Sequence, residues 1–542
     1  MTINLNRQTM NFTAIDLFAG IGGFRIAVER CGGNCIAFSE IDKDAIETYI
    51  SNYADTAETN LGDITVIRRL PQVDLLTAGV PCQSWSIAGR NLGFDDDRGM
   101  LWNDVLFLLN QSKPKAFIFE NVKGLADPRN RQALEYIHSR IAEAGYYSMQ
   151  YILNSCDYGA TQSRVRIYII GFREECHFNT FIPPKPSKSK LKLFDIIDDV
   201  IVHIPNHTKK TRNNNNVHYI CTSLPSFTSL STNNNGFNDY FLFNDIRNGS
   251  TTIHSWDILP TTQRQKEICL LLLRNRRKKG FGFLDGNPLS LAQFKTLDST
   301  ITKNELDELV TLGILKTENY LYAILDNIQH KTDLSEAARL ILSKNQSGVI
   351  VPDRLVCDSE IKKNRVKILE TLDSLEENGL VQCVETRYEF RNTKISTGLN
   401  GVCRIFLPSS NVFPTLVASD TNDYLTPILI HAENAENYKK EFIDKVFLPK
   451  QFRKISKLEA CRIQGFPDTF ILPESRSRWM KLLGNSVSVP LVQKLVQAIV
   501  NTGVFGTEQI RKPTQQKSVA SLRTSLTMRQ SDQAYEPLRF LN

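Results

Sequence analysis

The first third of the chain alternates short apolar runs with longer stretches whose apolar residues recur at helical spacing. The apolar runs cover residues 14–18, 35–38, 74–77, 116–119 and 166–171. Stretches at 24–29 and 44–53 have the spacing of helices. Strands that alternate with helices form βαβ units, in which helices cover both faces of a parallel sheet. The alternation therefore predicts an α/β fold built on a doubly wound parallel sheet.

Length and composition narrow the class of protein further. With 542 residues the chain exceeds one ordinary domain, so we expect two or three. A net charge of +7 favours a nucleic-acid partner without requiring one. Eleven cysteines, none spaced C-x-x-C, predict reduced thiols and no metal site. We find neither a secretory signal nor an apolar run long enough to span a bilayer, and expect a cytoplasmic protein.

The alternation of predicted strands and helices ends after about residue 173. Proline- and asparagine-rich stretches such as 183–186 and 213–216 predict surface loops, and a more helical region follows at 262–390. The α/β texture returns near residue 411, with helices expected at 457–464 and 489–500. We therefore expect four regions: a first domain, a large insertion, a return to the first domain and a polar basic tail, at 12–173, 174–400, 401–500 and 501–542.

The insertion contains a weak internal repeat. The segment around Gly313 is echoed around Gly379, at an offset of 66 residues (379 − 313). The matching residues are Leu309, Ile314, Leu315 and Tyr322 with Leu375, Leu380, Val381 and Tyr388. Each copy predicts a helix, a glycine that ends it and then a strand pair, the order found at the end of a winged helix-turn-helix. Two unrelated helix-to-strand corners would give the same pattern, so segments near 262–325 and 360–390 are winged-helix candidates only.

A glycine-rich turn follows the first predicted strand. Gly20, Gly22 and Gly23 lie where a helix begins, and glycines there let the backbone approach a ligand closely because no Cβ intervenes. Glu40 ends the next strand, where a carboxylate accepts hydrogen bonds from ribose hydroxyls. Asp63 is placed to receive an adenine amino group. These residues predict a nucleotide-type cofactor, but NAD, FAD or a purely structural turn would fit almost as well.

Three further segments fall where predicted strands end. Cys82 follows the run 74–78, and ligands bind at the carboxyl edge of open α/β sheets, so this thiol is a candidate nucleophile. Glu120 ends the strand at 116–119 and, taken alone, would also fit a solvated strand terminus. Arg164 and Arg166 are two apart on an extended segment and should project to the same face. Their guanidinium groups suit phosphate and base oxygens.

Taken in order, these motifs closely resemble those of the C5-cytosine-specific DNA methyltransferases. The strings that carry the resemblance lie at 16–23 (DLFAGIGG), 81–83 (PCQ), 120–122 (ENV), 162–166 (QSRVR) and 484–487 (GNSV). A late helix motif at 453–467 also matches, with Ile-Ser at 455–456 where the family usually has Leu-Thr. The resemblance covers roughly 12–173 and 400–500. The span between them falls where the family keeps its variable target-recognition region.

The resemblance implies a Rossmann-like methyltransferase fold that binds S-adenosylmethionine and double-stranded DNA. The implied cofactor residues are Phe18, Gly20, Gly22, Gly23, Glu40, Ile41, Asp63, Ile64, Asn485 and Val487. The implied catalytic residues are Cys82, Glu120, Arg164 and Arg166. Cys82 would attack C6 of a cytosine flipped out of the duplex. Glu120, kept protonated by an apolar pocket, would donate to N3, and the two arginines would hold the base oxygen and a phosphate.

We expect two regions to contact the DNA. Gln83 and Ser84 begin a loop, reaching to residue 99, that is a candidate lid over the flipped base. The basic run 274–279 suggests phosphate contacts by Arg276, Arg277 and Lys278, although a solvated helix face would look the same. Base-reading residues are expected between 289 and 426.

Other functions remain open at this point. A tRNA cytosine-5 methyltransferase uses the same chemistry, and a methyltransferase-like regulator would bind DNA without catalysis. A dinucleotide-dependent oxidoreductase would explain the glycine turn but not the Pro-Cys-Gln string at 81–83. The expected setting is a bacterial restriction–modification system with a cognate endonuclease that acts separately, and we expect a monomer. The recognised DNA sequence does not follow from these motifs.

Overall fold

The computed structural model divides the chain into two compact units. One unit comprises residues 1–217, 408–421 and 454–542, and the other 218–407 and 422–453. The described residues are 12–53, 59–81, 97–187, 191–198, 240–242, 253–282, 286–325, 334–345, 348–391, 401–402, 404–408, 410, 412–430 and 435–506. Because chain segments from before and after the second unit complete the first, the second unit is an insertion in the first.

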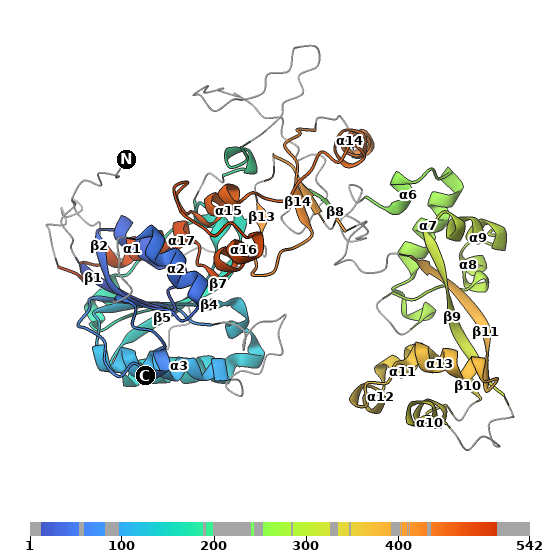
Figure 1. Ribbon diagram of the computed structural model, residues 1–542, viewed down its shortest axis with the longest axis horizontal. Coiled ribbons are helices and arrows are strands. Elements are labelled where there is room, and N and C mark those ends of the chain that lie inside the picture. Colours follow the sequence, from blue (N-terminus) through green and yellow to red (C-terminus); the bar gives the residue numbers. More distant parts are fainter. Residues whose placement is uncertain are drawn as a thin grey trace, which may run out of the picture. The chain divides into compact units, whose positions relative to one another are not determined.

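A six-stranded sheet forms the centre of the first unit, in the order β2-β1-β3-β4-β7-β5 (Figure 1). Its strands are β1 (Phe12–Leu17), β2 (Gly33–Ser39), β3 (Leu75–Gly79), β4 (Ala116–Val122), β5 (Tyr147–Asn154) and β7 (Val165–Phe172). The first four strands are parallel, whereas β7 is antiparallel to both β4 and β5. The predicted α/β fold is confirmed, but the sheet is mixed rather than wholly parallel.

Helices cover both faces of this sheet. They are α1 (Gly23–Arg30), α2 (Lys43–Asn52), α3 (Asp97–Ser112), α4 (Arg131–Glu143), α5 (Glu175–Thr180) and α17 (Val489–Val500). The helices α15 (Lys457–Gln464) and α16 (Arg476–Asn485) pack against each other, and α16 contacts α2. On one face, Trp102 of α3 and Ile137 of α4 share a buried core with Phe117. On the other face, Val28 of α1 and Leu495 of α17 share a second core. The sheet is therefore doubly wound, as predicted.

Local signals in the sequence explain the boundaries of the late helices. Ser456 caps α15 by accepting a hydrogen bond from the backbone N–H of Glu459, whose carboxylate in turn accepts from the N–H of Ser456. Gly465 ends the helix at φ 88°, a conformation that glycine adopts without strain. Pro490 lies in the first turn of α17, where its missing N–H is not needed. The helices predicted at 457–464 and 489–500 are confirmed.

The second unit contains two helical groups joined by a long two-stranded ribbon. The ribbon consists of β9 (Leu315–Ile324) and β11 (Val381–Phe390), which pair antiparallel along their length. The first group contains α6 (Ser255–Ile258), α7 (Gln263–Asn275), α8 (Leu291–Leu297) and α9 (Lys303–Thr311). The second contains α10 (Glu336–Ser343), β10 (Val349–Ile350), α11 (Pro352–Cys357), α12 (Ser359–Lys363) and α13 (Ile368–Glu377). Each group has its own buried core.

The internal repeat seen in the sequence corresponds to this ribbon. Gly313 ends α9 at φ 74°, and Gly379 ends α13 at φ 65°. After each glycine comes a single ten-residue strand, and the two strands pair with each other. The prediction of a separate strand pair in each copy was therefore wrong. The two copies share one ribbon.

A smaller sheet completes the second unit. It is formed by β8 (Tyr240–Leu242), β12 (Arg404–Phe406) and β14 (Asp423–Leu425), and a further core includes residues of α14 (Ala435–Phe442). In the first unit, β13 (Phe413–Pro414) pairs with β6 (Gln162–Ser163) and so attaches the returning chain to the sheet domain. Within the described residues no helix is both long and apolar enough to cross a membrane.

Candidate active site

The turn between β1 and α1 is built around glycines that serve different purposes. Gly20 and Gly22 have φ values of 55° and 83°, which favour glycine. A Cβ on Gly22 would lie 2.5 Å from the hydroxyl oxygen of Tyr53, and one on Gly23 would lie 2.8 Å from Val487 Cγ2. A Cβ on Gly20 would meet no atom of the described residues within 4 Å. Gly22 and Gly23 therefore permit close packing, whereas no described residue crowds Gly20.

The carboxylate of Glu40 ties the end of β2 to this turn. Its Oε2 accepts a hydrogen bond from the N–H of Gly20 (2.8 Å), and its Oε1 accepts from the N–H groups of Ile41 and Asp42 (both 2.8 Å). The side chain of Ile41 is 68% exposed, which is unusual for isoleucine. A fixed carboxylate and an exposed apolar side chain thus stand together at the carboxyl edge of the sheet.

Asp63 and Ile64 lie where the chain approaches β3. The Oδ1 of Asp63 accepts hydrogen bonds from the N–H and the hydroxyl of Thr65 (both 2.9 Å), and so caps the short helix Ile64–Val66. Ile64 is buried in the core on the α3 side of the sheet. These contacts fix the position of Asp63, and its proposed role toward an adenine ring stays a prediction.

The carboxyl ends of β1 and β3 meet the returning chain near Gly79. A Cβ on Gly79 would lie 3.9 Å from the carbonyl oxygen of Phe18 and 4.0 Å from Val487 Cγ1, so these groups border Gly79 without crowding it. Phe18 itself has φ 54°, which is uncommon for a bulky residue. Phe18, Gly79 and Glu40 thus lie at the carboxyl edge, where open α/β sheets bind ligands.

Glu120 lies at the carboxyl end of β4 and is only 7% exposed. The Nε of Arg166 is 3.1 Å from its Oε1. We expected an apolar pocket around Glu120, and this prediction was wrong, because a guanidinium group lies beside the carboxylate. The backbone N–H of Val80 donates to the carbonyl of Glu120 (3.2 Å), and the Asn121 side chain donates to the carbonyl of Val80 (3.3 Å). These bonds hold Glu120 beside the segment that leads to Cys82. Cys82, Gln83 and Ser84 themselves lie outside the described residues.

The two arginines of the 162–166 motif have different partners. Arg166 pairs with Glu120, whereas Arg164 is buried and donates from Nη1 to the carbonyls of Gly484 (3.1 Å) and Leu416 (3.3 Å). Arg166 thus lies beside Glu120, and its role toward the base stays a prediction. Arg164 fastens the returning chain to the sheet domain, a role that its spacing in the sequence did not indicate.

Two buried glutamines extend this connection and were missed by the sequence analysis. Gln162 donates to the side-chain oxygen of Gln464 (2.6 Å) and accepts from the N–H of Leu416 (2.8 Å). Gln464 in turn donates to the carbonyl of Leu483 (2.6 Å). Both glutamines are fully buried. Their place inside two motif strings was the only signal in the sequence, because Gln162 is 302 residues from Gln464 and 254 residues from Leu416.

The segment 484–487 reaches the glycine turn from the opposite side. A Cβ on Gly484 would lie 2.4 Å from the carbonyl carbon of Val417, so this position needs glycine. Asn485 ends α16 and is exposed, whereas Val487 is buried in the core that includes α1. Val487 thus packs against Gly23 of the glycine turn, and the cofactor-binding roles of Val487 and Asn485 stay predictions.

The basic run at 274–279 is only partly available to a ligand. Arg276 donates to the Glu389 carboxylate (2.7 Å), and its guanidinium carbon lies 5.6 Å from the ring centroid of Phe390. Arg277 is half-buried and Lys278 is exposed. Arg276 therefore supports the fold of the second unit. Lys278 is better placed than Arg276 to contact a phosphate.

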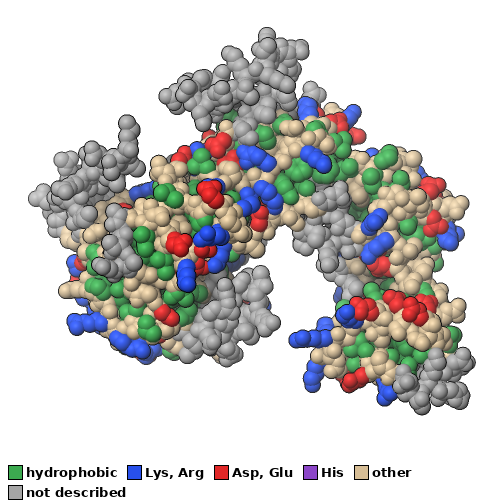
Figure 2. All heavy atoms as spheres, in the orientation of Figure 1, with side chains coloured by type: hydrophobic (Ala, Val, Ile, Leu, Met, Phe, Trp, Pro, Cys, Tyr) green, Lys and Arg blue, Asp and Glu red, His purple; other side chains and the backbone are tan. Residues whose placement is uncertain are grey.

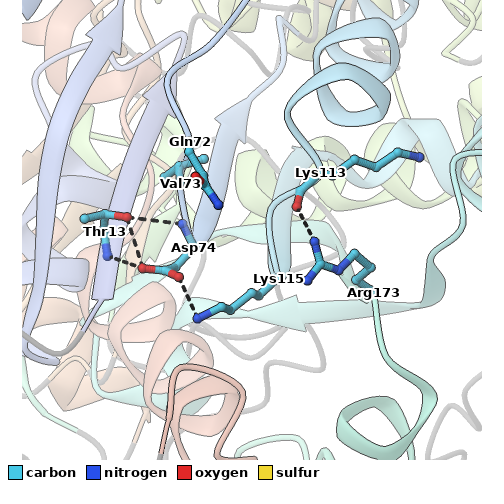
Figure 3. Close-up of a pocket in the computed structure, with 7 residues that line it drawn as sticks. All are labelled: Thr13, Gln72, Val73, Asp74, Lys113, Lys115 and Arg173. Atoms are coloured by element: carbon cyan, nitrogen blue, oxygen red, sulfur yellow. Dashed lines mark hydrogen bonds and ion pairs between the residues drawn. The ribbon is translucent and has the colours of Figure 1, made fainter.

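A pocket of about 270 Å³ lies at the opposite end of the strands (Figure 3). Its centre is Asp74, which accepts from the N–H and hydroxyl of Thr13 (2.9 and 3.0 Å) and pairs with Lys115 (2.9 Å). Arg173 donates to the carbonyl of Lys113 (3.1 Å). Ligands of open α/β sheets bind at the carboxyl edge, and this pocket is at the amino ends of β1, β3 and β4. Its charged groups join neighbouring strands.

The doubly wound sheet and the carboxylate-anchored glycine turn define an enzyme class that binds a nucleotide-type cofactor. The model of the C-5 cytosine-specific DNA methylase family matches residues 12–501, and the chain belongs to this family. It is thus a DNA (cytosine-5)-methyltransferase, and these enzymes use S-adenosylmethionine.

Relatives match the chain along most of its length. The Type II methyltransferase M.HgiBI of Herpetosiphon aurantiacus is 38% identical over 504 residues, which cover 92% of this chain and 98% of the relative. The Type II methyltransferase M.BanI of Aneurinibacillus aneurinilyticus is 28% identical over 518 residues, 91% of this chain and 97% of the relative. The solved Entamoeba histolytica methyltransferase EhMeth aligns over 90% of this chain and 98% of its own, with 14% identity and a TM-score of 0.43.

Proposed function

We propose that this chain methylates C5 of a cytosine that is flipped out of a specific duplex DNA sequence, through a covalent bond between Cys82 and C6. The observation that carries the proposal is the buried Glu120–Arg166 pair, held by backbone hydrogen bonds beside Val80, two residues before Cys82. C5 of cytosine is a poor nucleophile, so a thiolate must first add to the ring. The target atoms are inaccessible in a stacked duplex, which makes flipping necessary.

Cys82, Glu120 and Arg166 have separate roles in this proposed reaction. As the Cys82 sulfur bonds to C6, the ring electrons move toward C5, and N3 takes a proton from the carboxyl group of Glu120. Arg166 binds the base oxygen with a guanidinium group that lies beside Glu120 before the base arrives. S-adenosylmethionine, when bound at the Gly20–Glu40 edge, supplies the methyl group. A base then takes the C5 proton, the electrons of the C5–H bond restore the C5–C6 double bond and expel the Cys82 thiolate, and N3 returns its proton to Glu120.

The second unit is the proposed target-recognition region. It lies in the long insertion between the motifs, where the resemblance places the family's target-recognition region. The names of the relatives favour a Type II restriction–modification setting. We therefore propose that methylation protects DNA against a separate endonuclease and that the enzyme acts as a monomer. Incubation of plasmid DNA with radiolabelled cofactor, followed by mapping of the methylated cytosines, would identify the recognised sequence.

The decisive experiment is covalent trapping on a duplex in which 5-fluorocytosine replaces the methylated cytosine. In 5-fluorocytosine a fluorine replaces the C5 proton, and a base cannot remove it, so the last step is blocked. The wild-type enzyme should therefore remain covalently bound to the DNA through Cys82, whereas Cys82→Ser should form no adduct. Adducts with tRNA but not with DNA would show an RNA enzyme. Sequence-specific binding to DNA without any adduct would show a non-catalytic regulator.

A further inference from the structure

The two helical groups of the second unit are related by an approximate twofold axis through the ribbon. Leu289 forms a bridge with Tyr388, and Ile350 pairs with Tyr322 in the same way. The ends of the ribbon repeat this relation: the N–H of Arg391 donates to the Ile314 carbonyl (2.9 Å), and the N–H of Leu325 donates to the Leu380 carbonyl (3.0 Å). The offset is 66 residues in both (391 − 325 and 380 − 314). The repeat in the sequence is thus a structural duplication.

Each half has the order of elements of a winged helix-turn-helix domain. In the first half α7 precedes the bridge residue Leu289, which is followed by α8, α9 and β9. In the second half α10 precedes β10, which is followed by α11, α12, α13 and β11. The strand that completes each small sheet comes from the other half. In such domains the helix before the long strand, here α9 or α13, is the one that approaches DNA.

The ribbon sets the distance between the two halves. The strands β9 and β11 begin at opposite ends of it, because Leu315 pairs with Phe390 and Val381 pairs with Ile324. Nine steps along a strand at about 3.3 Å each separate these ends by about 30 Å. Paired helix-turn-helix domains bind half-sites one helical turn apart, about 34 Å along B-DNA. The spacing of the two halves therefore suits contacts about one turn apart on a single duplex.

The second half differs from the first by a basic turn before α13. Lys362, Lys363 and Arg365 are all exposed, and within the described residues none has a carboxylate within ion-pair distance. At the corresponding turn of the first half, Asp298 pairs with Arg264 (2.7 Å). Lys and Arg side chains project from the edge of the second half near α12 (Figure 2). The adjacent hollow of about 610 Å³ between α10 and α13 is lined by Glu336, Glu360 and Glu370 as well as by Arg365 and Lys367, so the excess of basic charge is confined to the turn itself.

We propose that Lys362, Lys363 and Arg365 form a phosphate-binding site, which we term the basic turn, that grips duplex DNA about one helical turn from the contact made by the first half. The inference rests on the proposed function and adds a binding site to it. The outer face of α13 carries Glu370 and Glu377, which repel phosphates. The contact is thus confined to the turn, and the basic turn increases affinity without reading bases.

The test compares the dissociation constants of long and short duplexes that carry the mapped methylation site. The variant is Lys362→Gln/Lys363→Gln/Arg365→Asn; asparagine is chosen because Arg365 has φ 52°. The control is Lys440→Gln/Lys445→Gln/Lys450→Asn, which removes the same charge from exposed positions and treats Lys450, at φ 55°, in the same way. Duplexes of about 12 and about 40 base pairs fall below and above the length that both halves need.

The wild type and the control should bind the long duplex about tenfold or more tightly than the short one, and the variant should lose most of this difference. The slope of log affinity against log salt on the long duplex should fall by about 2 to 3 in the variant, because three phosphate contacts are lost. Equal losses in variant and control, or an unchanged slope, would overturn the inference. Failure of the wild type to methylate any duplex would instead overturn the proposed function.

Discussion

At the scale of single residues, Glu120 is the group whose chemistry the site constrains most. It is buried, and its only described cationic neighbour in ion-pair range is Arg166. Glu120→Gln keeps the shape of the side chain but removes the transferable proton. We expect kcat to fall by about 10² to 10⁴ with little change in DNA affinity. Single-turnover methylation and equilibrium binding, measured on the same duplex, would separate the two effects. A rate near that of wild type would exclude proton donation by Glu120.

Asp16 is a buried acid that the proposed reaction does not use. It is 1% exposed, its Oδ1 accepts from the Thr77 hydroxyl (2.8 Å), and its Oδ2 has no hydrogen-bond partner among the described residues. Burial raises the pKa of Asp16 to about 7. Because this value exceeds that of the unfolded chain, the folded state binds an extra proton between about pH 4 and pH 7. Stability from this group is present at low pH and is lost as pH rises through 7.

Asp16→Asn should remove this pH dependence, because the amide cannot ionise. Relative to wild type, we expect the variant to gain about 1 to 3 kcal/mol in unfolding free energy between pH 5 and pH 8. Chemical denaturation at a series of pH values would measure the gain. A constant difference between variant and wild type across this range would show that Asp16 titrates normally.

At the scale of elements, the sequence predicted best where one short signal determines the structure. The capping pair Ser456–Glu459 and Gly465 fix both ends of α15, and the prediction of this helix was correct at each. The direction of a strand has no such signal, because the alternation of apolar and polar residues looks the same in both directions. We therefore expected β7 to be parallel to its neighbours, whereas it is antiparallel. The strand β5 was missed, since most of its residues are half-buried and its apolar pattern is weak.

The same reasoning applies to the candidate site. Glu40 and Glu120 were placed correctly at strand ends, because both follow clear apolar runs. The partners of Arg164 and Arg276 could not be predicted, since they lie 320 and 113 residues away in the chain. Only the fold brings such residues together. For this reason the sequence could not show whether Arg164 and Arg276 bind a ligand or stabilise the fold.

The Arg276–Glu389 pair joins the end of α7 to β11, and we expect it to be essential to the stability of the first half of the second unit. Both side chains are largely buried, at 12% and 3% exposure. Arg276→Met leaves a buried carboxylate without its cation, and we expect a loss of about 3 to 5 kcal/mol in the stability of the second unit. Arg274→Gln, on the exposed face of the same helix, is the control and should cost less than about 0.5 kcal/mol. Equal effects of the two changes would contradict this role.

At the scale of the whole molecule, the two units have separate cores and should unfold as separate transitions. S-adenosylhomocysteine binds where S-adenosylmethionine would, so it should stabilise only the first unit, by about 2.7 kcal/mol at 100 times its dissociation constant. Differential scanning calorimetry would resolve the transitions, and Arg276→Met would identify that of the second unit by lowering it alone. A single transition that responds to both changes would show that the units unfold together.

The packing of α17 against α1 has a consequence for how the enzyme is made. The sheet is finished when β7 ends at Phe172, yet its second face is only partly covered by α1 until α17 begins at Val489, 317 residues later (489 − 172). At ribosomal speeds of about 5 to 20 residues per second, this interval lasts roughly 15 to 60 s. Throughout that time the ribosome-bound chain exposes apolar surface that chaperones would recognise. A chain that terminates before Val489 lacks α17, which shares a core with Val28 of α1, and we expect such a chain to show no methylation activity.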